Sequence, residues 1–465
     1  MAVSLDDAMK ELPPPEDGQP CESAAATASD SLLESLPAEV RRYLLSLMDV
    51  QGLRALVHAS PVYHQQYLLD RTWLLRRCLD HTLRSVLVDA WAVYQTSEAR
   101  FARKRTMETV APFITAYQDR RAVFADTGAP SPAPTMDEVA GMMAYHIGVV
   151  MPLLRQYAGW ALDNLSRETE DTTHEAKDIT HEAKDTTYND TTYKSEDTTR
   201  DANETLTMTE ETRLMRALYR FELCSNLFGV RTERPTFEGI DIRITLERLY
   251  QPWEIEEISC IHTFVRDKFT QVFDEIRWDV DEDNPKYAGH QRPPTPDGVF
   301  DLVNQVDSFL KGCVSRGLVL LHSVLCQIHD HDTLVSTMQG SLVYFSGEFL
   351  GNDAFGMLTH DKRREEAPTP RDMKEARREP LPFRGDLAPD PDGMYPPLAW
   401  TLMWDGTYSN LLGNWIPGSL RRWGYVLWDA PRLVRTQAEE VLRKELQEHW
   451  GSYDPRDDQL YEEDY

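Results

Sequence analysis

The chain has 465 residues, of which 41% are hydrophobic and 10% are aromatic. This is enough apolar material for a sizeable globular core, and the length indicates two structural units or one large one. With 49 basic and 77 acidic residues, the formal net charge is −28. Phosphate repels so acidic a chain, and we therefore expect no nucleic-acid partner. Solubility is the simpler role of this acidity.

Targeting signals and cysteine usage indicate a compartment. Residues 1–30 lack the apolar segment of a secretory signal, and the longest apolar stretch, residues 317–328, is too short to span a bilayer. The six cysteines are scattered, with no C-x-x-C motif, which favours free thiols in a reducing environment. We therefore expect a cytoplasmic or nuclear protein without a membrane partner.

Residues 31–71 predict three short amphipathic helices. Pro37 pre-sets the first turn of the first helix, and four apolar residues then recur with helical spacing: Val40, Tyr43, Leu44 and Leu47. Ser60 is the expected N-cap of the third helix, and Pro61 is its expected first residue. Helices this short are marginal alone, so they must bury their apolar stripes against each other or against a partner.

The same stretch resembles an F-box. That motif opens with Leu-Pro-x-Glu-Leu/Ile and continues through spaced aliphatic residues to a serine and an aromatic residue. The matching residues here are Leu36, Pro37, Glu39, Val40, Leu44, Leu45, Leu47, Met48, Leu53, Leu56, Val57, Ser60 and Tyr63. Residues 55–71 are also similar to a group of filamentous-fungal proteins with degenerate F-boxes.

The resemblance implies a partner. F-box modules dock onto the Skp-type linker subunit of a cullin ubiquitin ligase, while the rest of the chain recruits a protein substrate. Carried over to this sequence, the linker-binding side chains are Leu36, Pro37, Val40, Leu44, Leu53 and Leu56. A plain helical bundle that happens to begin with Leu-Pro is the alternative interpretation of these residues.

Residues 72–166 predict a helical region that packs on the F-box-like module, whereas residues 1–30 are Pro-, Ala- and acid-rich and predict a disordered tail. The helices expected in this region are 72–95, 98–124 and 137–165. The last of them is apolar on much of its circumference, so we expect it to be buried, with a kink at Pro152.

Residues 167–209 differ from the flanking helical segments in composition and contain a repeated sequence. The string Thr-His-Glu-Ala-Lys-Asp occurs at 173–178 and again at 180–185. The period of seven residues suggests a coiled coil, but large aliphatic residues are too few for an apolar seam. We therefore predict a disordered insertion. His174 and His181 have the chemistry to bind a metal, but simple repetition is the favoured explanation of their spacing.

Residues 210–450 predict a helical C-terminal domain with loops at 279–297 and 361–397, and residues 451–465 form an acidic tail. The expected helices are 210–228, 253–278, 299–310, 317–329 and 431–450. Asp429 is the expected cap of the last one. Strict two-residue alternation, typical of strands, is nearly absent.

Catalytic motifs are absent from the sequence: it contains no GxGxxG, no GxxxxGK[ST] and no HExxH. The best metal-like cluster comprises Cys326, His329 and His331, but no second pair of ligands follows at a defined distance. Polar residues at a helix C-terminus are the simpler interpretation. We expect no enzymatic activity, no catalytic residue, no cofactor and no bound metal.

Five tryptophans cluster between residues 400 and 428: Trp400, Trp404, Trp415, Trp423 and Trp428. Aromatic residues beside arginines are typical of interface anchors, but aromatic cores are common too. The core is the favoured interpretation, and a mixed arrangement with some exposed rings is expected. The candidate recognition surface comprises Trp404, Trp415, Trp423, Arg421 and Arg422.

Together these patterns predict a mostly α protein. An N-terminal F-box-like three-helix module precedes a larger irregular helical domain with disordered insertions. The favoured function is an F-box-type substrate adaptor that links an unknown target to a Skp/cullin ubiquitin ligase. The alternative is a structural or protein-interaction protein with a vestigial F-box and no ligase role, and an enzyme comes third.

Overall fold

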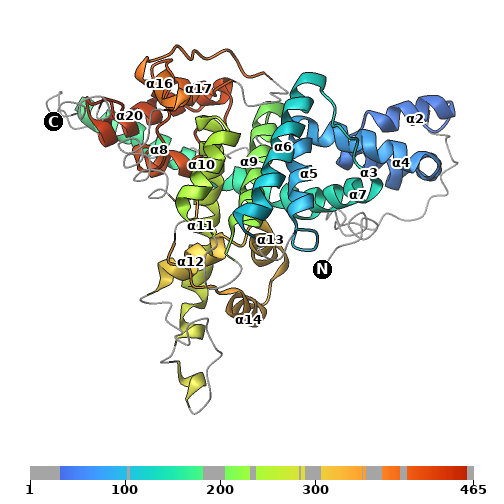
Figure 1. Ribbon diagram of the computed structural model, residues 1–465, viewed down its shortest axis with the longest axis horizontal. Coiled ribbons are helices and arrows are strands. Elements are labelled where there is room, and N and C mark those ends of the chain that lie inside the picture. The colour runs from blue at the N-terminus through green and yellow to red at the C-terminus, as the bar shows by residue number, and fades with distance from the viewer. Residues whose placement is uncertain are drawn as a thin grey trace, which may run out of the picture. The chain divides into compact units, whose positions relative to one another are not determined.

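The computed structural model describes residues 32–101, 105–181, 205–230, 237–281, 284–288, 305–347, 349–351, 369–387 and 395–457 (Figure 1). Within these ranges the chain forms helices and turns and no strand, apart from one antiparallel bridge between Pro380 and Thr407. The predicted mostly α fold is therefore confirmed. The chain divides into two compact units, residues 1–153 and 154–465, which are described separately.

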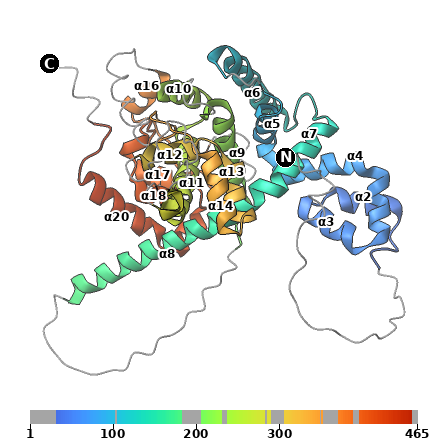
Figure 2. The same cartoon turned by 90° about the horizontal axis from the view of Figure 1, so that it is seen from below.

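The first unit begins with three helices at the predicted places: α2 (Ala38–Ser46), α3 (Val50–Ala59) and α4 (Pro61–Leu83). Both α2 and α3 pack against α4 (Figure 2). The Asp49 carboxylate caps α3 by accepting a hydrogen bond from the Gly52 amide at 2.6 Å. Ser60 caps α4, and Pro61 is at its first turn, as predicted.

The third short helix and the expected helix 72–95 are one element. No breaker occurs between Pro61 and Leu83, so α4 runs through both. Arg84 then adopts a φ of 46°, which ends α4, and a 3₁₀ turn (Arg84–Val86) leads into α5 (Leu87–Thr96). The next helix, α6 (Met107–Thr127), starts later than expected, and it ends at Gly128 with a φ of 66°.

Next come α7 (Met136–Tyr145), which packs against α4 and α5, a π turn (His146–Val150) and α8 (Met151–His181). The π turn lies directly before Pro152, the residue at which a kink was predicted. Proline has no N–H and its ring clashes with the carbonyl four residues earlier, which explains an irregular turn at this place.

The insertion was predicted to begin at residue 167, and that boundary is wrong, because the backbone of α8 stays helical to His181. The first copy of the repeat is therefore part of a helix. The predicted end of the insertion at residue 209 is also too late, because α9 begins at Met208 with Thr207 as its N-cap. Residues 182–204, the middle of the predicted insertion, lie outside the described residues. So do residues 1–31 and residues 458–465 of the acidic tail.

The second unit is built around α11 (Pro252–Val280), whose apolar stripe is wide enough to bind neighbours on several sides. The helices that pack against it are α9 (Met208–Phe228), α10 (Gly239–Leu249), α12 (Val306–Val314), α13 (Leu318–His322), α14 (His331–Ser341) and α18 (Gly418–Arg422). Helices α10 and α14 were not predicted. The predicted helix 317–329 is present as α13 and a π turn (Ser323–Gln327), and it ends close to the predicted place. Helix α14 then begins at His331 with Asp330 as its N-cap, so the metal-like sequence 326–332 joins the end of one helix to the start of the next.

The end of this unit consists of short helices: α16 (Pro370–Ala376), α17 (Leu398–Met403), α18, α19 (Ala430–Arg435) and α20 (Ala438–Trp450). The predicted helix 431–450 is divided at Gln437, which has a φ of 58°. Helix α16 lies within the predicted loop 361–397. Thr369 and Asp372 form a capping box at the start of α16, and proline is common in the first turn of a helix, so the Pro-rich sequence is compatible with a helix here.

Among the described helices, none alone is long and apolar enough to cross a bilayer, although α12 together with residues Leu318–Gln327 meets that test as a pair bent by 102°. The cysteines that the structure describes are free thiols: Cys78, Cys224, Cys260, Cys313 and Cys326.

Candidate functional site

The segment that opens the F-box-like match is held firmly to its module. The Tyr63 hydroxyl donates a hydrogen bond to the Leu33 carbonyl at 2.9 Å. The Arg41 guanidinium donates to the carbonyls of Leu36 at 2.7 Å and Glu34 at 3.1 Å. These bonds fix the Leu-Pro segment against the start of α4, so it presents a defined surface.

Helix α2 turns its main apolar stripe away from the module core. Val40, Tyr43 and Leu47 are 43%, 64% and 49% exposed. The core of the module is filled by other side chains, including Leu45, Val57 and Tyr63, which are buried. The stripe that defined this helix in the sequence is therefore left without a covering partner among the described residues.

The structure distributes the six predicted linker-binding residues over three environments. Pro37 and Val40 are exposed, and Leu36, Leu44 and Leu56 are half-buried. Leu53 is only 1% exposed and packs the core of the module, so it offers no free surface. The sequence assignment omitted Tyr43 and Leu47, although both had been recognised as members of the apolar stripe.

The tryptophan cluster lies in the core of the second unit. Trp404, Trp423 and Arg421 are at most 1% exposed, so the favoured interpretation of a core is confirmed for these three residues, and the candidate recognition surface is wrong for them. The indole of Trp404 stacks on Trp450 with ring centroids 5.0 Å apart. Of the other two candidates, Trp415 is half-buried and Arg422 is exposed.

Charged residues occupy the core beside these aromatic rings. Helix α11 carries three buried glutamates, and each binds an arginine from another element. Glu254 accepts a hydrogen bond from Arg220 of α9 at 2.5 Å, and Glu257 accepts two from Arg216 of α9 at 2.6 and 2.9 Å. The third, Glu256, accepts two from Arg421 of α18 at 2.7 and 2.8 Å.

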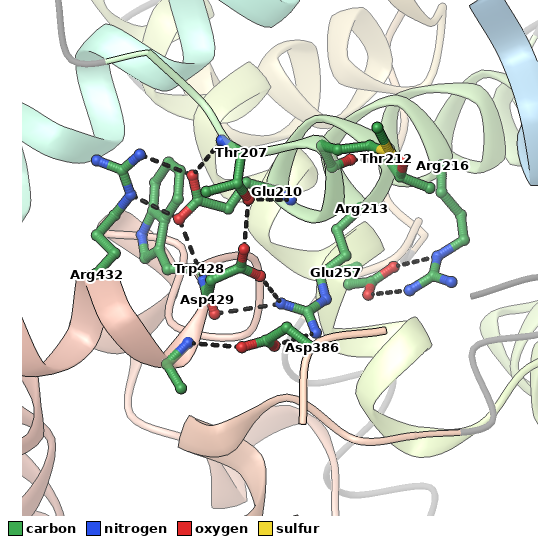
Figure 3. A network of polar contacts seen from close by, with 12 residues as sticks. Thr207, Glu210, Thr212, Arg213, Arg216, Glu257, Asp386, Trp428, Asp429 and Arg432 are labelled. Atoms are coloured by element: carbon green, nitrogen blue, oxygen red, sulfur yellow. Dashed lines mark hydrogen bonds and ion pairs between the residues drawn. The ribbon is translucent and has the colours of Figure 1, made fainter. Parts of the chain in front are cut away.

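A second part of the network joins α9 to α19 (Figure 3). Glu210 accepts hydrogen bonds from Arg432 at 2.6 and 2.7 Å. Arg213 donates to Asp429 at 3.0 Å and to Asp386 at 2.9 Å. The predicted cap Asp429 does stand at the start of α19, but its carboxylate accepts hydrogen bonds from Arg213 and Thr207 instead of capping the helix.

Burial and pairing shift the acidity of these groups in opposite directions. Burial raises the pKa of Asp429 to about 6, despite the hydrogen bond from Thr207 and the nearby Arg213 guanidinium. For Glu210, burial also acts to raise the pKa, but hydrogen bonds from Arg432 and from the Thr207 amide outweigh it and hold the pKa below its usual value. The network therefore joins two arginines to three carboxylates, and the nearby Asp386 and Glu210 also act to raise the pKa of Asp429.

No cluster of three or more histidine, cysteine or acidic residues suited to a metal occurs in the part of the chain that the structure describes. In the metal-like sequence 326–332, the side chain of His331 instead lies 2.8 Å from Asp279 and 3.3 Å from Glu275 on α11. These two bonds raise the pKa of His331 above its usual value. The residue thus ties α14 to α11.

Comparison with known proteins identifies no relative: no family model matches the chain, and no curated protein or solved structure does.

Proposed function

We propose that this chain is an F-box-type substrate adaptor. Its N-terminal module would bind the Skp-type linker subunit of a cullin ubiquitin ligase, and its second unit would hold a target protein for modification. Such an adaptor would act in the cytoplasm or nucleus, where these ligases work. The residues of the Leu-Pro motif and the shape of the module support the proposal together.

The observation that carries the proposal is the exposed stripe of α2. A helix of nine residues is too short to be stable alone, and its own module buries only Leu45 and Ser46 from it. Val40, Tyr43 and Leu47 keep about half of their surface in water, so covering each of them is worth roughly half of the ~1.5–3 kcal/mol for a fully exposed apolar side chain. A partner that covers this stripe recovers that free energy.

The decisive experiment places a charge in the stripe. Val40→Glu would bury an unpaired carboxylate in the complex and should weaken linker binding about a hundredfold or more. Because Val40 is exposed in the free protein, the helical circular-dichroism signal should not change. Binding is measured with the purified linker subunit by isothermal calorimetry.

A matched control is available in the same unit. Val123 on α6 is 38% exposed, so Val123→Glu introduces the same charge at a similar exposed valine outside the α2 stripe. This variant should bind the linker as the wild type does. If the wild-type chain fails to bind the linker, the adaptor proposal is refuted, and the interaction protein with a vestigial F-box becomes the better account.

A further inference from the structure

Helix α4 carries a second exposed stripe that the F-box-like motif does not use. Leu69 is 82% exposed, and Trp73, one turn later, is 38% exposed. The exposed side chains of Arg76 and Arg77 follow three and four residues after Trp73. Residues three and four apart lie on one face of a helix, so these four side chains form a continuous surface, here called the α4 stripe.

Helix α2 contributes an arginine to the same surface. The Arg42 guanidinium lies over the Trp73 ring, 4.4 Å from its centroid, and its Nε is 3.3 Å from a carboxylate oxygen of Asp70. The cation–π contact holds the indole in place while leaving part of it in water. The tryptophan is thus pre-ordered, which lowers the entropy lost when a partner binds.

The α4 stripe is separate from the stripe of α2. At 3.6 residues per turn, Arg42 lies about 100° or more around α2 from Val40, Tyr43 and Leu47. The side of α2 that carries Arg42 and adjoins the α4 stripe is therefore not the side that carries Val40, Tyr43 and Leu47. A partner that covers the α2 stripe need not touch the α4 stripe.

The segment that carries this surface lacks the acidic excess of the whole chain. Residues 32–83 contain six arginines and five acidic residues, whereas the whole chain has a net charge of −28. Among the described residues, neither Arg76 nor Arg77 forms an ion pair, although both act to lower the pKa of Asp80 on the same helix. Asp70 is already bound to Arg42 and Gln66. Two guanidiniums therefore remain open to an external carboxylate.

The composition also points to a protein partner. Tryptophan and arginine are the residue types most enriched in interface hot spots, and an exposed leucine beside them supplies apolar area. Arginine binds carboxylates through two parallel hydrogen bonds, which gives both strength and geometry. From these observations we propose that the α4 stripe docks an acidic segment of a separate protein, one that carries at least one large apolar side chain.

The test uses a fluorescein-labelled synthetic peptide of repeated Glu-Glu-Leu units and the full-length protein, with binding followed by fluorescence anisotropy. Control peptides replace each Glu by Gln or each Leu by Ser. We expect binding of the Glu-Glu-Leu peptide, at least about tenfold weaker binding of both controls, and loss of affinity as the salt concentration rises from about 0.05 M to about 0.3 M.

Variants connect the binding to the surface. Arg76→Glu/Arg77→Glu and Leu69→Ser should each weaken peptide binding at least about tenfold. The matched control is Arg443→Glu, because the Arg443 side chain is 68% exposed on the second unit. Equal binding by the wild type and by the Arg76→Glu/Arg77→Glu variant would overturn the proposal, as would equal binding of the Glu and Gln peptides.

Two further experiments separate docking at the α4 stripe from the adaptor function and from binding of the protein's own acidic tail. Val40→Glu should leave peptide binding intact, and Arg76→Glu/Arg77→Glu should leave linker binding intact, so failure here is distinguishable from failure of the adaptor function. The second experiment uses a chain that ends at Asp457. If this truncated chain binds the peptide about tenfold more tightly than the full chain, the α4 stripe belongs to the protein's own acidic tail and not to a separate partner.

Discussion

Glu256→Gln tests whether the buried charges of α11 are matched as described. The glutamate is 0% exposed and its partner Arg421 is 1% exposed. The substitution keeps the volume of the side chain and removes its charge, so the buried Arg421 guanidinium loses the carboxylate that accepts two of its hydrogen bonds, while its bond to the Gly413 carbonyl at 2.8 Å remains. Breaking a buried pair in this way costs about 3–5 kcal/mol.

The free energy of unfolding is measured by urea denaturation, with tryptophan fluorescence reporting on the rings beside Arg421. The control is Asp307→Asn, which removes a partner of the exposed Arg266, 2.9 Å away, and should cost at most about 1 kcal/mol. A double variant, Glu256→Met/Arg421→Met, tests the cause, because replacing both charges with apolar side chains of similar volume is often neutral. The reasoning fails if Glu256→Gln costs less than about 1 kcal/mol, or if the double variant is less stable than the single one.

Three more predictions concern the second unit. Burial raises the pKa of Glu445 to about 7, so wild-type stability should fall as the pH rises from the ordinary value of 4.5 through about 7, by about 3 kcal/mol at most. Glu445→Gln, which mimics the protonated form, should remove this contribution in denaturation curves taken across that pH range, and the loss that remains should be that of Asp429, whose pKa is raised to about 6. Trp423→Ala should cost about 3–5 kcal/mol and yield insoluble protein, and a soluble variant with native melting would contradict the core assignment. Deleting residues 182–204 should leave the melting temperature unchanged, whereas a deletion that also removes Thr207 should lower it, because Thr207 caps α9 and binds Asp429.

Local signals explain how much of this fold could be predicted. The cap at Ser60 placed the start of α4 correctly because a cap depends only on neighbouring residues. The break at Arg84 could not be predicted, since an arginine with a positive φ carries no glycine or asparagine signature. Apolar periodicity located the helices but gave no information about which unit or partner covers each face.

Because local patterns do not show what covers a helix face, they could not separate exposed candidate-site residues from buried ones. Tyr43 is apolar and exposed, whereas Arg421 is charged and buried. The difference lies in distant residues: Arg421 is buried because Glu256, 165 positions earlier in the chain, neutralises it. No window of local sequence contains that pairing, so the burial of the tryptophan cluster and the exposure of α2 could be established only from the folded chain.

The ionic network also has a consequence for biosynthesis. Glu210 and Glu256 are made long before their arginines, since Arg432 follows Glu210 by 222 positions. Until the C-terminal helices emerge from the ribosome, α9 and α11 hold carboxylates that cannot enter an apolar core, and the second unit cannot close around them. A chain truncated before Arg421 would therefore expose the apolar surface of α11 and attract chaperones or proteases, so that only complete copies accumulate.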